Sequence, residues 1–272
     1  MRLLFLGNSD DLNPETPEEQ RAPHLCAQFL SEATGQPCEV IARVIWPSPD
    51  LPDLLDRWLD RYEPDLVLFK ITWFWYGYES VPIRIERVLG RLGRPIAGAG
   101  LRAAATPALG HSRPFKLGRR MAHRLIGGDS PFTPKQVIEI TELCLRRVIA
   151  REGTIVVAKG TATYDLAGEV MIADYKPRFA ARRNLVEGSL EAFCNRLRIQ
   201  WADNRNTGGV EHEGIDLGDG LHKIASVQET FARLHARDLK AAIEAAGGMP
   251  HAPARNEHGE LSSDTPISNR SR

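Results

Sequence analysis

Residues 3–9 read Leu-Leu-Phe-Leu-Gly-Asn-Ser, and this stretch gives the first indication of the fold class. An apolar run that ends in a glycine turn is typical of a strand buried on both faces. The run at 65–72 has the same character, and further strands are predicted at 40–45, 154–158 and 198–202. Strands that are apolar almost throughout belong to parallel sheets covered on both sides.

Helical patterns separate these strands. Thr16, Pro17 and Glu19 resemble a capped helix start, and Thr133 with Gln136 repeats that pattern before a second long helix. The other helices are expected around 54–59 and over 79–92, 182–197 and 223–246. Because each parallel pair of strands needs a crossover connection, the alternation predicts a doubly wound α/β fold.

The chain organisation is interpreted as a single domain over 1–246 followed by a tail. Within the domain, 94–128 mixes glycine, alanine and basic residues without clear periodicity, so we interpret it as a basic insertion over one edge. The tail, 247–272, is rich in proline, serine and charge and is predicted to be disordered.

Composition narrows the classes of function. Lysine plus arginine (35) equals aspartate plus glutamate (35), so net charge does not attract the whole chain to nucleic acid or an anionic membrane. The 4 cysteines form no C-x-x-C pair, which argues against a zinc ribbon and fits reduced thiols. The apolar run 3–6 is too short for a signal peptide, and no stretch is long enough to span a bilayer. We therefore expect a cytoplasmic protein whose partner is a small molecule, not a nucleic acid; the oligomeric state stays open.

Ser9 is the first candidate for chemistry. In doubly wound sheets ligands bind beyond the carboxyl ends of the strands, and Ser9 lies in the turn after the first strand. A serine hydroxyl needs a base that titrates near neutrality and an acceptor that orients this base. Asp219-Gly220-Leu221-His222 places a carboxylate and an imidazole close enough to touch.

These two segments carry a resemblance. Gly7-Asn8-Ser9 and Asp219-Gly220-Leu221-His222 resemble the first and last conserved blocks of the SGNH hydrolases, also called GDSL esterases and lipases. The resemblance implies a flavodoxin-like, three-layer α/β/α fold and the hydrolysis or transfer of acyl esters without a metal or other cofactor. It further implies Ser9 as nucleophile, His222 as general base and Asp219 as the residue that orients it.

The oxyanion donors depart from the family pattern. Members usually provide a glycine amide after the second strand and an asparagine after the third, where this chain has Trp46-Pro47-Ser48-Pro49 and Thr72-Trp73-Phe74-Trp75. The possible replacements are the Ser9 amide, Ser48, Thr72, Trp73, Trp75 and Asn13. The residues expected to bind substrate are Asn8, Ser48, Thr72, Trp73 and Trp75.

Two alternatives stay open for the candidate site. Without the usual donors, the chain could be a catalytically silent binding module of the same fold. A metal-dependent hydrolase could instead use imidazole and carboxylate ligands from 212–222, namely His212, Glu213, Asp216, Asp219 and His222.

Other features are given simpler interpretations. A second Gly-Asp-Ser, at 128–130, follows no strand and is interpreted as a chance match to the motif without a catalytic role. His111 and His123 are expected on the surface. The basic stretch from Arg84 to Arg124 is interpreted as a solvated helical face or, alternatively, as a recognition surface for an anionic substrate or partner.

Overall fold

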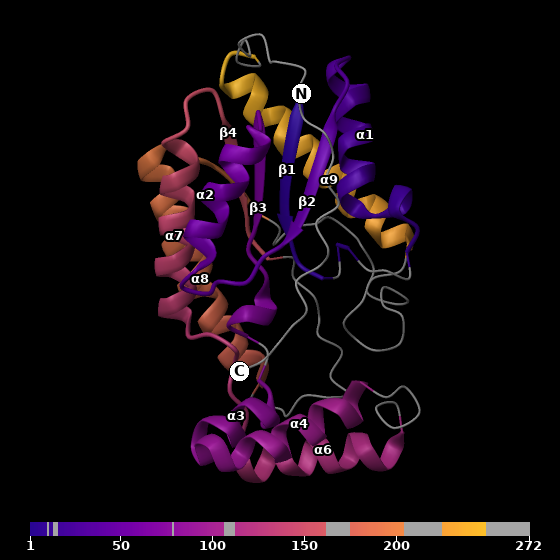
Figure 1. The fold of residues 1–272 in the computed structure, drawn as a ribbon, viewed down its shortest axis with the longest axis vertical. Coiled ribbons are helices and arrows are strands. Elements are labelled where there is room, and N and C mark those ends of the chain that lie inside the picture. The colour runs from indigo at the N-terminus through magenta and orange to yellow at the C-terminus, as the bar shows by residue number, and fades with distance from the viewer. Residues whose placement is uncertain are drawn as a thin grey trace.

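The computed structural model describes residues 1–9, 11–12, 16–77, 79–105, 112–161, 175–203 and 225–248. Within these ranges five parallel strands form one sheet in the order β2-β1-β3-β4-β5 (Figure 1). The strands are β1 (Arg2–Gly7), β2 (Glu39–Val44), β3 (Leu66–Lys70), β4 (Ile155–Lys159) and β5 (Gln200–Ala202). This order is that of flavodoxin-like sheets, and it reverses direction at the β1/β3 pair.

Helices cover both faces of the sheet (Figure 1). One face packs against α1 (Ala22–Thr34) and α9 (Ala225–Ala245). The other packs against α2 (Leu51–Tyr62), α7 (Pro134–Ile149) and α8 (Tyr175–Leu197). The predicted three-layer α/β/α fold is therefore confirmed.

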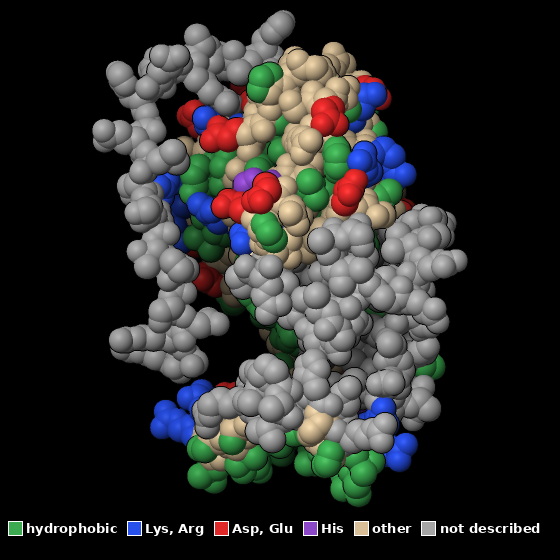
Figure 2. Space-filling view, turned by 90° about the vertical axis from the view of Figure 1, so that its right-hand side faces the viewer, with side chains coloured by type: hydrophobic (Ala, Val, Ile, Leu, Met, Phe, Trp, Pro, Cys, Tyr) green, Lys and Arg blue, Asp and Glu red, His purple; other side chains and the backbone are tan. Residues whose placement is uncertain are grey.

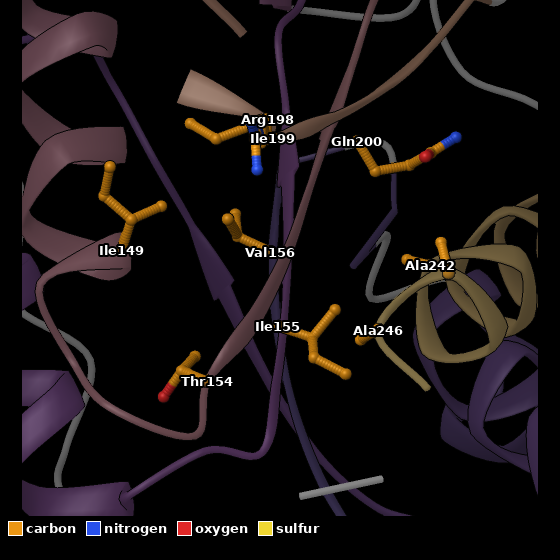
Figure 3. Close-up of a pocket in the computed structure, with 10 residues that line it drawn as sticks. Ile149, Thr154, Ile155, Val156, Arg198, Ile199, Gln200, Ala242 and Ala246 are labelled. Atoms are coloured by element: carbon orange, nitrogen blue, oxygen red, sulfur yellow. The ribbon is translucent and has the colours of Figure 1, made fainter. Parts of the chain in front are cut away.

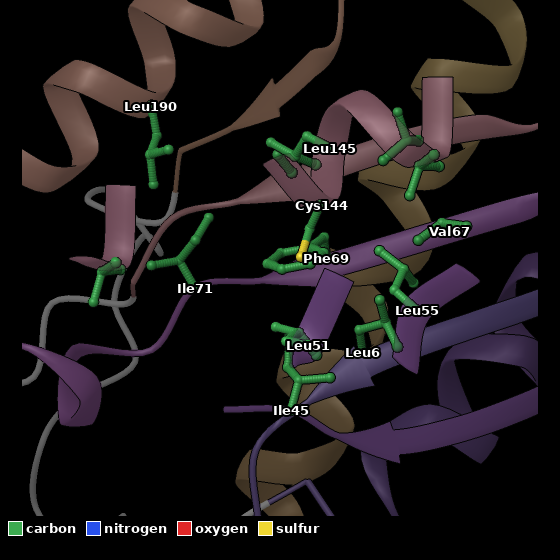
Figure 4. Close-up of a cluster of buried hydrophobic side chains, with 14 of the residues drawn as sticks. Leu6, Ile45, Leu51, Leu55, Val67, Phe69, Ile71, Cys144, Leu145 and Leu190 are labelled. Atoms are coloured by element: carbon green, nitrogen blue, oxygen red, sulfur yellow. The ribbon is translucent and has the colours of Figure 1, made fainter. Parts of the chain in front are cut away.

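Successive side chains of each strand point to opposite faces of the sheet, so the core consists of two clusters. Leu4 and Leu6 of β1 face the α2, α7 and α8 side, whereas Leu3 and Phe5 face the α1 and α9 side. Figure 4 shows the first cluster, in which Leu6, Val67 and Phe69 lie among side chains from the covering helices. Residues 3–6 of β1 and 66–69 of β3 are apolar because both faces of these strands are buried, whereas the edge strand β2 is part-exposed.

A helical lobe follows β3. It consists of α3 (Val81–Leu89), a 3-10 turn (Gly90–Leu92), α4 (Gly93–Ala105) and α6 (Arg113–Ile126). Figure 1 shows it beyond the lower end of the sheet, the end at which the strands finish. The expected irregular insertion at 94–128 is therefore largely helical in its described part. Ser112 begins α6 as its N-cap, accepting the Phe115 amide at 3.4 Å.

The two predicted helix starts had different outcomes. The capping box of Thr133 and Gln136 is present at the start of α7. The start predicted at Thr16 is wrong, because a short 3-10 turn (Glu18–Gln20) comes first and α1 begins after Arg21. Pro23, in the first turn of α1, marks the actual start, since proline needs no amide partner there.

Candidate functional site

Ser9 lies where the topology predicts a site. It is exposed in the turn that follows β1, a strand paired on both sides and next to the point where strand order reverses. The turn is closed by the Asp11 amide on the Asn8 carbonyl at 3.2 Å and by the Leu12 amide on the Ser9 carbonyl at 3.3 Å. The serine is thus presented at the carboxyl edge of the sheet on a hydrogen-bonded turn.

A buried carboxylate anchors this turn. Asp11 is completely buried and accepts the Asn8 amide at 3.0 Å. Its other oxygen forms an ion pair with Lys70, the last residue of β3. Gly7 is required beside it, because a Cβ at that position would collide with the Asp11 carboxylate. This steric conflict explains why the first residue of the Gly-Asn-Ser motif is glycine.

The Asn8 side chain bridges two strand exits. Its amide nitrogen donates to the Thr72 hydroxyl at 3.4 Å, while its oxygen accepts the Asp11 amide at 3.2 Å. Asn8 and Thr72, both predicted to bind substrate, are therefore in contact with each other directly beside Ser9. Their observed bonds hold the end of β1 against the end of β3.

The other predicted substrate-binding residues are placed differently. Ser48 donates to the Trp46 carbonyl at 3.4 Å, and its hydroxyl also holds the pKa of Asp50 below the ordinary value. Trp73 stacks edge-on against Phe179 with the ring centroids 6.1 Å apart. Trp75 is 1% exposed and belongs to the core on the α2, α7 and α8 side. Thr72, by contrast, is bonded to the Ser9 turn through Asn8.

Several predicted residues lie outside the described ranges. They are Asn13, His212, Glu213, Asp216, Asp219 and His222, together with His111. Among the residues that are described, no group of three His, Cys, Asp or Glu side chains is arranged to hold a metal ion.

A second polar network lies at the end of β4 and was not predicted. Lys159 is fully buried and forms an ion pair with Asp238 of α9. Burial lowers the pKa of Lys159, and Asp238 opposes that shift. Charged groups thus end β4 as well as β3, on the edge of the sheet that carries Ser9.

Glu187 of α8 belongs to a separate buried cluster just beyond the end of β4. It accepts the Thr161 amide at 2.8 Å and pairs with Arg183 at 3.1 Å. Burial raises the pKa of Glu187, while Arg183 and the Thr161 amide act in the opposite direction. Thr161 and Glu187 are 26 residues apart, so no local motif indicates their contact.

Glu79, just before α3, joins the helical lobe to α8. Its carboxylate is 1% exposed and contacts Arg178 at 3.3 Å, Arg182 at 3.2 Å and His123 at 3.4 Å. The expected surface position of His123 is wrong: it is 7% exposed and packs against this carboxylate.

The second Gly-Asp-Ser is structural. Asp129 pairs through its backbone with Ser80, and its carboxylate binds Arg84 at 3.3 Å. Ser130 is buried and donates to the Phe132 carbonyl at 3.0 Å. Ser130 is therefore buried and hydrogen-bonded within a bend, in agreement with its interpretation as a match to the motif without a catalytic role.

The cysteines are poor candidates for a nucleophile. All four are free thiols, and Cys26, Cys144 and Cys194 are buried. Burial raises the pKa of Cys144 and of Cys194 to about 12. Because the thiolate is the reactive form, these groups stay inert at neutral pH.

A pocket of about 250 Å³ lies at the opposite end of the sheet. Figure 3 shows Thr154 and Ile155 at the start of β4 and Ile199 and Gln200 near the start of β5, beside Ala242 of α9. These are amino ends of strands, so the pocket is remote from the turn that carries Ser9.

Comparison with solved structures identifies the fold. The chain is similar to the crystal structure of TesA, with 16% identity and a TM-score of 0.54 over 89% of this chain and 99% of that one. It is also similar to a GDSL-like lipase from Parabacteroides merdae, with 13% identity and a TM-score of 0.51 over 88% of this chain and 95% of that one. No protein-family model and no curated sequence matches the chain. At these identities the likeness shows the fold alone, a three-layer α/β/α fold similar to those of TesA and the GDSL-like lipase.

Proposed function

We propose that the protein is a serine hydrolase that cleaves or transfers a carboxylic acyl ester, with Ser9 as its nucleophile. The observation that carries the proposal is the position of Ser9: exposed, at the carboxyl end of an inner strand, on a turn anchored by a buried ion pair. A fold shared with a GDSL-like lipase supports the same chemistry.

In the proposed reaction His222 removes the Ser9 proton as the hydroxyl oxygen attacks the ester carbonyl. Asp219 orients the imidazole and stabilises its charged form. Collapse of the tetrahedral intermediate releases the alcohol, which takes the proton from His222. Water, or an acceptor alcohol, then attacks the acyl-serine by the same acid–base cycle and releases the acyl group.

The oxyanion requires hydrogen-bond donors near Ser9. The Ser9 amide is one candidate, and the Thr72 hydroxyl is another because its bond with Asn8 places it beside the nucleophile turn. Loss of one such donor typically costs about a hundred- to a thousandfold in turnover. Thr72→Val should therefore reduce turnover strongly if Thr72 is a donor, and only mildly if the Ser9 amide dominates.

A fluorophosphonate probe tests the nucleophile directly. The wild-type chain should be labelled on Ser9, and Ser9→Ala should abolish labelling. Ser130→Ala is the matched control, since it removes the serine of the other Gly-Asp-Ser and should leave labelling intact. An unlabelled but folded wild type would contradict the proposal and favour a silent binding module.

Two further measurements test the partners of Ser9. His222→Ala should slow labelling and ester hydrolysis by orders of magnitude, and Asp219→Asn should do so through loss of imidazole orientation.

A chelator such as EDTA should leave the rate unchanged. Inactivation by the chelator, with recovery on added zinc, would instead support the metal alternative.

A further inference from the structure

The helical lobe exposes an unusual number of large apolar side chains. Of thirteen exposed large hydrophobic residues in the described part of the chain, eight belong to this lobe. They are Val88, Leu89, Leu92, Ile96, Leu117, Met121, Leu125 and Ile126, which we call the apolar tip. Leu92 and Leu125 are 81% and 82% exposed. Burial cannot explain this apolar content, since these side chains face outwards.

The apolar tip follows helical spacing. Leu117, Met121 and Leu125 recur every four residues and therefore form one stripe along α6. Figure 2 shows hydrophobic side chains gathered along the lower edge of the lobe, below lysine and arginine side chains. An apolar edge with basic residues behind it is the arrangement of helices that lie in a membrane interface.

The charge of the lobe is strongly one-sided. Residues 80–128 contain ten lysines and arginines and one acid, Glu86. Arg94 neutralises Glu86 at 3.1 Å, while Arg91 and Arg124 are exposed. The balanced charge of the whole chain thus conceals a basic lobe offset by acidic residues elsewhere. A surface with dense negative charge complements this lobe.

We propose that the apolar tip inserts into the headgroup region of a membrane containing anionic lipids. The leucine side chains would enter the acyl boundary, and arginines behind them would bind lipid phosphates. A second copy of the chain is a poorer occupant, because two basic lobes repel each other. A nucleic acid would engage the arginines but leave the apolar tip in water.

The mode of contact is peripheral. No helix in the described ranges has the length and apolar character needed to cross a bilayer. The inference rests on residues of the helical lobe alone, so it does not depend on the proposed esterase activity.

Vesicle sedimentation tests the inference. The full chain is mixed with sucrose-loaded vesicles of phosphatidylcholine alone or of phosphatidylcholine with phosphatidylglycerol. We expect the chain to sediment with the anionic vesicles only, and the bound fraction to fall as salt rises. Leu92→Ser/Leu125→Ser should weaken partitioning at least about tenfold, since it removes two inserted apolar side chains.

Leu143→Ser/Leu185→Ser is the matched control. It makes the same change at leucines that are 43% and 56% exposed on α7 and α8, outside the lobe. This control should bind as the wild type does. The inference is overturned if the wild type ignores anionic vesicles, or if both double variants bind equally. It is also overturned if sedimentation velocity shows a wild-type dimer that the Leu92/Leu125 variant dissociates, because the tip would then be a contact between copies.

Discussion

The ion pair between Asp11 and Lys70 should make a large contribution to stability. Asp11 is fully buried and the Lys70 side chain is 11% exposed, so water cannot replace Lys70 as the partner of Asp11. Asp11→Asn keeps the shape of the side chain but removes the charge that pairs with the Lys70 ammonium group. Breaking one side of a buried ion pair costs about 3–5 kcal/mol. Because Lys70 keeps some contact with solvent, we expect about 3 kcal/mol.

Thermal and urea unfolding measure this cost. In a protein of this size each kcal/mol shifts Tm by about 2–4 °C, so Asp11→Asn should lower Tm by about 6–12 °C. Asp11→Leu combined with Lys70→Met removes both charges and should recover part of the loss. The loss in free energy of unfolding of the double variant should therefore be about 2 kcal/mol smaller than the sum of the losses in the two single variants.

An exposed ion pair provides the comparison. Lys135 and Glu139 lie 3.7 Å apart with side chains 82% and 61% exposed. Glu139→Gln should change stability by no more than about 0.5 kcal/mol. If Asp11→Asn costs as little as Glu139→Gln, the Ser9 turn is not anchored by this pair and the reasoning is refuted.

The remaining predictions concern other buried groups. Burial raises the pKa of Glu187 above its ordinary 4.5, so the folded protein binds the proton of this carboxyl more tightly than the unfolded chain does. The contribution of Glu187 to the free energy of unfolding is therefore fully present below pH 4.5 and is lost as pH rises through the raised pKa. Glu187→Gln should lack this loss, which Tm measured from acid to neutral pH against the wild type will show. Glu79→Gln should cost about 2 kcal/mol in urea unfolding, because its arginine partners are part-exposed and only the carboxylate is fully desolvated; a change below that of Glu139→Gln would contradict it. Burial raises the pKa of Cys38 to about 11, so a disulfide reagent should label it slowly at neutral pH and faster as pH rises. The three other thiols should react only after denaturation, and rapid labelling of four thiols in the native chain would contradict this.

The sheet and its covering helices could be predicted from sequence because their apolar patterns have one cause. A residue such as Leu4 or Phe69 is apolar because it is buried in the core. The predicted strands therefore match the observed ones to within one or two residues. The same reasoning failed at 94–128, where α4 and α6 carry apolar side chains that face outwards. Where apolar side chains face a binding partner and not the core, their spacing in the sequence does not indicate which residues are buried.

The site was predictable only in part. The location of Ser9 follows from a general rule, since chemistry in doubly wound sheets lies beyond the carboxyl ends of the strands. Its anchor does not follow, because Asp11 and Lys70 are 59 residues apart and share no motif. In the sequence Lys70 appears merely as an interruption of an apolar run. Long-range ion pairs of this kind become visible once the strand register is known.

That register explains why the turn after β1 has its anchor. Leu6 pairs with Phe69 in the parallel ladder, so the next residues along, Gly7 and Lys70, leave their strands at the same level. Lys70 then reaches the Asp11 carboxylate that folds back over Gly7. A slip of one residue between the two strands would turn the side chains of one strand to the opposite face and bury the ammonium group in the core. The charge that holds the Ser9 turn therefore also opposes misregistered pairing of β1 with β3.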